Sequence, residues 1–310
     1  MIRTRGLTKD FVTGRKTRVH AVRGISLDVE PGELVAVLGP NGAGKTTTMR
    51  MLTTLIEPTA GTAVVAGHDV TREPDRVRRR IGYVGQGNGA AHTQRVGDEL
   101  RVQGRIYGLD RREARRRADE LLATLDLAEL GERKVTDLSG GQRRRLDVAI
   151  GLVHAPELLF LDEPSTGLDP QNRANLWSHI ARMRAELGMT IVLTTHYLDE
   201  ADSMAERVVI VDHGEVIADD TPVALKAKLA GDRIIATGDG PALARVAAEL
   251  PGARDLTVDA DGIDVRVSDG PAALPELVTA AAGAVRTAEV RRPTLDDVFL
   301  ALTGRNLREA

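Results

Sequence analysis

At 310 residues the chain is long enough for two domains and a sizeable core. Its formal net charge of −3 provides no global basic field of the kind that recruits nucleic acid. The lack of cysteine excludes disulfides, zinc ribbons and iron–sulfur clusters bound by this chain's thiolates. Because no apolar signal core or run of ~20 apolar residues is present, we expect a cytosolic protein that reaches any membrane through a partner.

The N-terminal part of the chain predicts strands that lead to a glycine-rich loop. Residues 1–35 are expected to form short strands around turns at Thr13-Gly14 and Pro31-Gly32. The apolar run Leu34–Leu38 predicts a buried parallel strand. Residues Gly39–Thr46 then read GPNGAGKT, which fits the phosphate-loop pattern G-x-x-x-x-G-K-S/T. Thr46–Leu52 predicts a helix, and this order of strand, loop and helix favours a nucleoside triphosphate site over a turn that binds nothing.

Each residue type in this loop has a chemical reason. Gly39, Gly42 and Gly44 tolerate a positive φ and let backbone N–H groups approach a polyphosphate closely. Lys45 brings a cation to the β- and γ-phosphates, and Thr46 offers a hydroxyl to Mg²⁺. The helix that follows directs the positive end of its dipole at the same phosphates.

The middle of the chain changes from strands to helices. Residues 61–86 continue the strand-rich part, and from about 89 to 155 the pattern is helical, with amphipathic candidates at Asp98–Tyr107 and Glu113–Leu125. Three basic runs are interpreted as solvated helix faces. They are Arg76–Arg80, Arg111–Arg117 and Arg143–Arg145.

A second anion site is predicted where Leu138–Gln142 read LSGGQ. Ser139 is a favourable N-cap, and Gly140 and Gly141 expose backbone amides at the start of a helix. Since one domain with one nucleotide needs only one such site, we expect this one to face the nucleotide of another copy. A capped surface helix without a ligand is the alternative.

Two carboxylates and a histidine follow buried strands. Leu158–Glu163 read LLFLDE, so Asp162 and Glu163 emerge at the carboxyl end of a strand, the edge where parallel sheets bind ligands. Asp162 suits Mg²⁺, and Glu163 is placed to polarise an attacking water. The strand Thr190–Thr195 ends at His196, which is expected to contact a γ-phosphate and a neighbouring carboxylate; a structural histidine is the alternative.

A smaller unit is expected after a boundary at Gly231-Asp232. Alternating patterns in the order βαββαβ predict a ferredoxin-like unit with a hairpin turn at Asp261-Gly262. The last helix, Leu295–Thr303, has an apolar stripe that must bury either within the chain or against a second copy. The stripe consists of Leu295, Val298, Phe299 and Leu302. The sequence of residues 231–310 shows no catalytic constellation.

Together these motifs resemble the nucleotide-binding subunit of ATP-binding-cassette (ABC) transporters over about residues 1–225. Two further segments resemble the daunorubicin-resistance branch of drug exporters, Ile81–Gly87 and the tail Arg292–Leu300. The resemblance implies an α/β P-loop NTPase (RecA-like) core in residues 1–230, with an inserted helical subdomain at about 89–155. It leaves residues 231–310 as a small α+β, ferredoxin-like accessory domain.

The resemblance also assigns the site. It implies catalytic roles for Lys45, Glu163 and His196, and Mg²⁺ binding by Thr46, Gln86 and Asp162. Phe11 lies where the family places an adenine-stacking aromatic, although core packing is the other reading. The implied ATP-binding residues are Phe11, Gly39, Pro40, Asn41, Gly42, Ala43, Gly44, Lys45, Thr46, Thr47, Gln86, Ser139, Gly140, Gly141, Gln142 and Asp169.

The expected function is hydrolysis of ATP, with Mg²⁺, by two copies that enclose two nucleotides and power export of a hydrophobic drug, antibiotic or lipid-like substrate. Separate permease subunits in the membrane would carry the cargo, and this chain would lie peripherally on the cytoplasmic face. The run Arg143–Arg145 could instead help to bind the opposed nucleotide or the permease. The rivals are a soluble ABC ATPase on ribosomes or DNA, a nucleotide-gated module without turnover, and an importer ATPase. Glu163 and His196 disfavour the second rival, and the C-terminal unit argues mildly for export.

Overall fold

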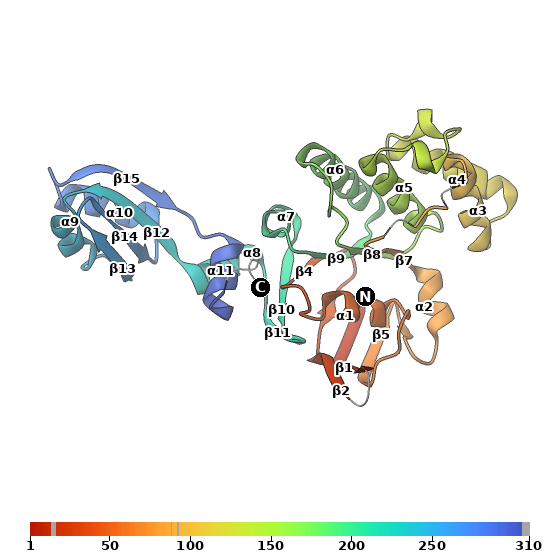
Figure 1. The fold of residues 1–310 in the computed structure, drawn as a ribbon, viewed down its shortest axis with the longest axis horizontal. Coiled ribbons are helices and arrows are strands. Elements are labelled where there is room, and N and C mark those ends of the chain that lie inside the picture. The colour runs from red at the N-terminus through yellow and green to blue at the C-terminus, as the bar shows by residue number, and fades with distance from the viewer. Residues whose placement is uncertain (14–16, 88, 92, 306–310) are drawn as a thin grey trace. The chain divides into compact units, whose positions relative to one another are not determined.

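The computed structural model describes residues 1–13, 17–87, 89–91 and 93–305 (Figure 1). The chain divides into two compact units. The first comprises Met1–Tyr197 with Met204–Ala218, and the second comprises Leu198–Ser203 with Asp219–Ala310. The expected domain boundary at residue 230 stays a prediction; strand β12 begins at Asp232, directly after Gly231.

An antiparallel sheet opens the first unit. Its strands are β1 (Ile2–Thr13), β2 (Thr17–Ile25), β3 (Asp28–Val29), β5 (Ala60–Val65) and β6 (His68–Asp69). They follow the order β2-β1-β5-β6, and β3 also pairs with β1.

The expectation of short strands is wrong for the first two elements, because β1 has 12 residues and β2 has 9. Their pairing runs from Leu7 opposite Ile25 to Thr13 opposite Thr17 and passes two irregularities. Such bulges bend and twist a ribbon without ending it, so β1 and β2 stay paired as one long hairpin. Of the expected turn at Thr13-Gly14, Gly14 lies outside the described residues.

A second sheet carries the strand ends that the motifs follow. Its order is β11-β10-β4-β9-β8-β7, and the strands from β10 to β7 are parallel. These strands are β4 (Leu34–Leu38), β7 (Ile81–Val84), β8 (Leu158–Asp162), β9 (Thr190–Thr195), β10 (Arg207–Asp212) and β11 (Glu215–Asp220). All residues of β4, β8 and β9 are buried, as expected of strands covered on both faces.

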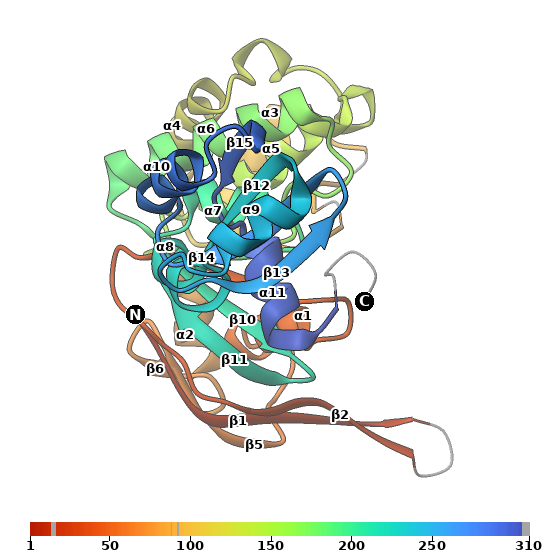
Figure 2. The same ribbon diagram turned by 90° about the vertical axis from the view of Figure 1, so that its left-hand side faces the viewer.

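The helices of the first unit lie on both sides of this sheet (Figures 1 and 2). They are α1 (Lys45–Leu52), α2 (Pro74–Arg80), α3 (Val96–Ile106), α4 (Arg111–Thr124), α5 (Gly140–Leu152) and α6 (Pro170–Leu187), with 3₁₀ turns η1 (Ala128–Leu130) and η2 (Val135–Asp137). Of these, α3 and α4 lie farthest from the sheet, beyond α5 (Figures 1 and 2). Helices α3, α4 and α5 pack on one another within the segment expected to be helical. No helix among the residues that the structure describes combines the length and the hydropathy needed to cross a bilayer.

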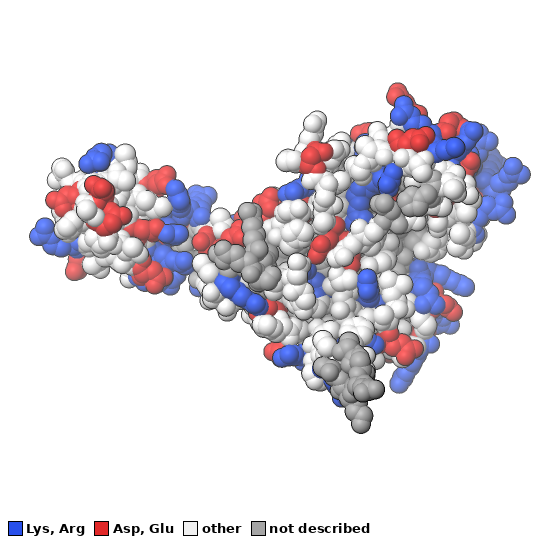
Figure 3. All heavy atoms as spheres, in the orientation of Figure 1, with Lys and Arg blue, Asp and Glu red and all other residues white. Residues whose placement is uncertain are grey.

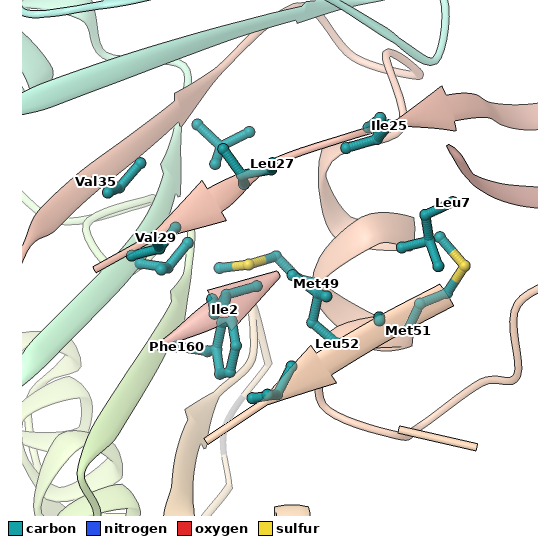
Figure 4. Packing of buried hydrophobic residues seen from close by; sticks show 14 of the residues in the cluster. Ile2, Leu7, Ile25, Leu27, Val29, Val35, Met49, Met51, Leu52 and Phe160 are labelled. Atoms are coloured by element: carbon teal, nitrogen blue, oxygen red, sulfur yellow. The ribbon is translucent and has the colours of Figure 1, made fainter. Parts of the chain in front are cut away.

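One hydrophobic cluster joins the two sheets to α1 (Figure 4). Met49 and Leu52 of α1 lie in it together with Ile2 of β1 and Phe160 of β8, and each is at most 1% exposed. Burial of a side chain of this size contributes about 1.5–3 kcal/mol. The cluster therefore anchors the helix that follows the phosphate loop, and the loop is held between fixed elements.

The second unit contains α7 (Leu198–Met204), α8 (Pro222–Leu225), the π-helical turn η3 (Lys226–Ala230), β12 (Asp232–Gly238), α9 (Gly240–Ala247), β13 (Arg254–Asp259), β14 (Gly262–Val267), α10 (Gly270–Ala280), β15 (Val285–Arg291) and α11 (Leu295–Thr303). The sheet order is β13-β14-β12-β15 and all neighbours are antiparallel, which confirms the expected βαββαβ unit.

The hairpin of this unit differs from the expected one by a residue. The two loop residues are Ala260 and Asp261, and Gly262 already pairs with Asp259. A Cβ on Gly262 would lie 2.4 Å from the carbonyl oxygen of Ala236. The glycine is therefore required by the close approach of β12 and not by the turn.

The apolar stripe of α11 is buried within the chain. Leu295, Val298 and Phe299 are at most 1% exposed, while Leu302 is partly buried. The helix packs against η3 and α8 of its own unit. This is the first of the two readings that the sequence left open.

Candidate nucleotide-binding site

The phosphate loop has the backbone that its glycines predict. Gly39, Gly42 and Gly44 have φ values of 155°, 79° and 102°. A Cβ on Gly39 would lie 2.1 Å from the carbonyl oxygen of Val211, so a side chain is excluded there by space as well as by φ. Gly44 is the N-cap residue of α1, whose first helical residue is Lys45.

The Lys45 side chain folds back over this loop. Its Nζ donates to the carbonyl oxygens of Gly39 at 2.6 Å and Pro40 at 3.0 Å. Burial lowers the pKa of Lys45, and the nearby carboxylates of Glu163 and Asp162 oppose that shift. A cation is thus held in the loop with both carboxylates near it.

A cavity of about 370 Å³ lies over the loop. This volume falls within the range of ligand sites. It is lined by Val19, His20, Ala21, Pro40, Asn41, Gly42, Ala43, Gly44, Lys45, Thr46, Thr47, Gln86 and Glu163. The sequence reasoning missed Val19, His20 and Ala21, because only the hairpin pairing brings β2 to the loop.

Phe11 lies close to this region but does not line the cavity. It pairs with Val19 across the hairpin, is 38% exposed, and has Lys9 Nζ 5.3 Å from its ring centroid. The core-packing reading is therefore wrong. The adenine-stacking role stays a prediction, supported by the position of Phe11 opposite a cavity residue.

Three oxygen-bearing side chains converge at the end of β8. Thr46 Oγ1 donates to Asp162 Oδ1 at 3.0 Å, and Gln86 Nε2 donates to Thr46 Oγ1 at 3.2 Å. Thr194 Oγ1 donates to the same Asp162 oxygen at 2.7 Å, and Tyr83 OH lies 3.4 Å from the other. The structure thus brings together the residues predicted to bind Mg²⁺ and adds two partners that hold the carboxylate.

Glu163 occupies a strained position beside His196. Its φ of 48° is left-handed, which is unusual for glutamate. Its backbone N–H donates to the Thr194 carbonyl oxygen at 3.1 Å, and Thr166 Oγ1 donates to Glu163 Oε2 at 3.3 Å. His196 Nδ1 lies 3.5 Å from the same oxygen. The predicted carboxylate and histidine therefore meet at the cavity that Glu163 lines.

The signature residues start helix α5. Ser139 is its N-cap and forms a capping box with Gln142, whose side chain accepts from the Ser139 N–H at 2.9 Å. Ser139 and Gly140 are exposed. A Cβ on Gly141 would lie 2.3 Å from Asn172 Oδ1, so a side chain at this position would displace the Asn172 side chain of α6. Among the described residues that line the cavity, none comes from Ser139–Gln142.

Asp169 caps helix α6. Its carboxylate accepts from the backbone N–H of Asn172 at 2.9 Å and from the side-chain amide at 2.6 Å. These bonds lower the pKa of Asp169, so the group is ionised at neutral pH. The predicted contact of Asp169 with a nucleotide stays a proposal.

The reading of Arg143–Arg145 as a solvated face is wrong. Arg144 is 8% exposed, Arg143 donates to the Val135 carbonyl oxygen at 3.3 Å, and Arg145 donates to that of Leu125 at 2.9 Å. The guanidinium groups of this run therefore donate to backbone carbonyl oxygens of the chain instead of facing solvent alone. By contrast, the arginines of α4 form part of the basic surface over α3 and α4 in Figure 3. The exposed ones are Arg111, Arg112, Arg115 and Arg116.

Comparisons with known proteins agree with this geometry. The sequence model of the family "ABC transporter" matches residues 22–166, and that of the family "ATP-binding protein DrrA1-3-like, C-terminal domain" matches residues 221–303. The daunorubicin resistance ATP-binding protein DrrA3 of Streptomyces coeruleorubidus is 46% identical, with 98% of each chain covered. The linearmycin resistance ATP-binding protein LnrL of Bacillus subtilis is 35% identical over 100% of both chains.

The fold has solved counterparts. The dimeric ATP-binding cassette MJ0796, in a post-hydrolysis state bound to ADP and Pi, superposes with a TM-score of 0.66 at 26% identity, covering 71% of this chain and 98% of the other. The expected fold class, a P-loop ABC cassette with a second α+β unit, is confirmed. On this evidence the chain belongs to the ABC transporter ATP-binding proteins and, within them, to the family of daunorubicin-resistance ATPases.

Proposed function

We propose that this chain is the ATP-hydrolysing subunit of an ABC exporter, working in pairs beneath separate permease subunits on the cytoplasmic face of the membrane. The observation that carries the proposal is that Lys45 and Glu163 line one cavity, while Asp162 is hydrogen-bonded to Thr46, which lines the same cavity. A cation for the phosphates, a carboxylate for a metal and a carboxylate for water are the parts that phosphoryl transfer needs.

Mg²⁺ fits the residues at the end of β8. Thr46 and Gln86 are linked by one hydrogen bond, and Thr46 and Asp162 by another, so a hydroxyl, an amide and a carboxylate lie within one small region. Oxygen ligands of this kind, completed by waters and phosphates, suit Mg²⁺. When bound, the ion would neutralise charge that develops on the phosphates. Thr46, Gln86 and Asp162 are the residues proposed to hold it.

The chain's own groups divide the remaining work. Lys45 would release its loop carbonyls to contact the β- and γ-phosphates. Glu163 would orient the attacking water and accept its proton, with His196 fixing the carboxylate through Oε2. Because the hydroxyl of Thr166 donates to the same oxygen, the carboxylate is positioned before a nucleotide arrives.

The second half of each site is proposed to come from another copy. Ser139, Gly140 and Gly141 present the N-terminus of α5, and the first two are exposed. Backbone amides at a helix N-terminus bind anions. The cassette MJ0796 is dimeric with bound ADP and Pi, which supports a working pair of copies. In the proposed pair, these amides face the nucleotide of the partner. Binding of ATP would close the pair, and hydrolysis would add charge and reopen it.

The cargo is proposed by analogy with the relatives' names. Those names specify resistance to daunorubicin, doxorubicin and linearmycin, and others specify export of Nod factor. We therefore propose a hydrophobic drug, an antibiotic or a lipid-like molecule as cargo. The purified chain can be reconstituted with its permease in vesicles, so that the chain and ATP lie outside. If the complex exports, the vesicles should accumulate such a cargo. Loss of cargo from loaded vesicles would identify an importer.

The ATPase assignment is tested by Glu163→Gln. The amide keeps the shape and the hydrogen bonding but loses the basicity, so we expect turnover to fall by about 10²–10⁴-fold. ATP binding should persist, and MgATP should trap a dimer visible by size-exclusion chromatography. Glu157→Gln is the matched control, since Glu157 is an exposed residue just before the same strand and should leave turnover unchanged. Undiminished hydrolysis by the Glu163 variant would remove this residue from catalysis.

A further inference from the structure

Arg144 lies just over one turn into helix α5, whose N-cap is Ser139, and each of its nitrogens donates to the backbone of another segment. Nη1 donates to the carbonyl oxygen of Gly85 at 2.7 Å, and Nε donates to that of Pro164 at 2.6 Å. Nη2 lies 3.4 Å from the carbonyl oxygens of Asp162 and Glu163. The carbonyls thus belong to residues that precede Gln86 and surround Glu163.

Asp147 lies one turn further along α5 and binds the backbone that follows Gln86. We call residues 85–87, with Gly89 and Ala90, the Gln86 segment. Its Oδ1 accepts from the backbone N–H of Gly89 at 2.9 Å and of Ala90 at 3.3 Å. Its Oδ2 lies 4.0 Å from Arg144 Nη1. Two charged side chains of one helix therefore form hydrogen bonds to the backbone before and after Gln86.

Both groups are buried at an energetic cost. Arg144 is 8% and Asp147 is 4% exposed. Burial lowers the pKa of the arginine and raises that of the aspartic acid, and each shift is opposed by the charge of the other residue. A buried pair of this kind is weak evidence for stability, because apolar side chains of the same volume often stabilise a core more. Its presence beside the proposed catalytic groups is better explained by positioning.

We infer that Arg144 and Asp147 form a clip that fixes the Gln86 segment and the Glu163 turn to the helix carrying Ser139. Because a helix moves as a rigid element, a displacement of Ser139 is carried to the carbonyls that Arg144 holds. Contact between Ser139 and the partner's nucleotide would then adjust Gln86 and Glu163 of the same copy. The inference rests on the proposed head-to-tail pair and makes Arg144 and Asp147 positioning residues that couple the two sites.

The neighbouring Arg145 distinguishes this role from simple anchoring. It lies on the same helix, its side chain is largely buried, and it also donates to carbonyl oxygens, but to those of Leu125 and Asp126. Those carbonyls follow α4 and do not adjoin a catalytic residue. Arg145→Gln is therefore a control that removes a similar set of bonds without touching the clip.

The experiment compares Arg144→Gln with Arg145→Gln in four measurements: ATP binding, kcat, melting temperature and hydrogen exchange. We expect Arg144→Gln to bind ATP as the parent does but to lose about 10²-fold in kcat, the effect of misplacing catalytic groups by about 1 Å. Arg145→Gln should lower the melting temperature similarly and keep its kcat. In a Glu163→Gln background, MgATP should change hydrogen exchange at Gly89 and Ala90, and Arg144→Gln should abolish that change while the dimer still forms.

Each outcome separates the clip from the proposed function. If the Glu163→Gln parent forms no dimer with MgATP, the head-to-tail pair is wrong. If the dimer forms and Arg144→Gln matches Arg145→Gln in kcat and in hydrogen exchange, the clip is overturned. Should Arg144→Gln fail to fold, Asp147→Asn replaces it, since its amide oxygen still accepts from Gly89 and Ala90 while the charge facing Arg144 is lost. The Asp147→Asn variant is then compared with Arg145→Gln by kcat and by hydrogen exchange.

Discussion

Glu163 shows how one residue combines strain with function. A left-handed backbone costs a non-glycine residue on the order of 1–3 kcal/mol, and it persists where surrounding bonds determine it. Here the N–H of Glu163 is held by Thr194 of the neighbouring strand β9. The turn directs the carboxylate to the cavity and to His196. Strain at this position supports its assignment as the residue that orients water.

A second residue, His154, is expected to make the free energy of unfolding depend on pH. Its Nε2 donates to the Ile81 carbonyl oxygen at 2.9 Å, and its ring stacks on Tyr107 with centroids 3.8 Å apart. Its Nδ1 is buried and has no hydrogen-bond partner among the described residues. Burial lowers the pKa of His154, the carbonyl opposes this shift, and Arg117 adds to it.

As the pH falls through about 6.5, His154 therefore binds a proton in the unfolded chain more readily than in the folded chain. The free energy of unfolding should fall over the same range, because the unfolded state binds more protons. We expect His154→Phe, which keeps an aromatic ring against Tyr107, to be less stable at neutral pH because Ile81 loses a donor. Its stability should nevertheless depend less on pH. Urea unfolding between about pH 7.5 and 5.5 measures this slope. Equal slopes for the two proteins would show that His154 does not contribute.

At the scale of elements, helix α11 buries its apolar face against other elements of the second unit. Truncation of a buried phenylalanine costs about 3–5 kcal/mol, so Phe299→Ala should strongly lower the unfolding midpoint of the second unit. Leu300→Ala is the control, since Leu300 is 37% exposed and its truncation should cost far less. Differential scanning calorimetry with and without ATP would assign the transition. A change in oligomeric state instead of stability would favour contact with a second copy.

The elements also show what the sequence can predict. The phosphate loop, the strand before Asp162 and the βαββαβ order follow from local patterns, and the structure confirms them. The starts of α9 and α10 also have a local signal, since Asp239 and Asp269 cap each helix directly before a Gly-Pro pair.

Other features had no local signal. The burial of Arg144 depends on carbonyls 59 and 20 positions away, at Gly85 and Pro164. A run of three arginines reads as a polar face until those partners are placed. The same holds for Val19 and His20, because only the long pairing of β1 with β2 brings them to the phosphate loop. Periodicity describes one segment at a time, and these contacts join several.

At the scale of the whole molecule, the two proposed halves of the nucleotide site lie in different places on the chain. Lys45 lines the cavity, whereas Ser139 is exposed at the start of α5 and does not line it in the described structure. Two copies arranged head to tail would join the halves. The proposed pair therefore predicts that lesions in the two halves complement each other when they lie on different copies.

Mixing Ser139→Ala with Lys45→Ala tests this directly. Each variant alone should hydrolyse little ATP, because every site of its dimer lacks one half. The mixed dimer keeps one intact site, formed by Lys45 of the first copy and Ser139 of the second, while its other site carries both lesions. ATPase activity above that of either variant alone is the expected result, and its amount should peak at equal proportions.

A cross-link provides a measurement that does not depend on turnover. Since the chain has no cysteine, Ser139→Cys and Asn41→Cys introduce single thiols at the signature and in the phosphate loop. Mixed copies carrying one thiol each should form a disulfide between chains only when MgATP closes the pair, and Asn41→Cys alone should not. A double variant carries Ser139→Cys and Asn41→Cys in the same copy. If it forms the disulfide within one chain, Ser139 serves its own site and the head-to-tail pair is excluded. Because both halves must then lie within one copy, the exposed start of α5 would have to close over its own phosphate loop.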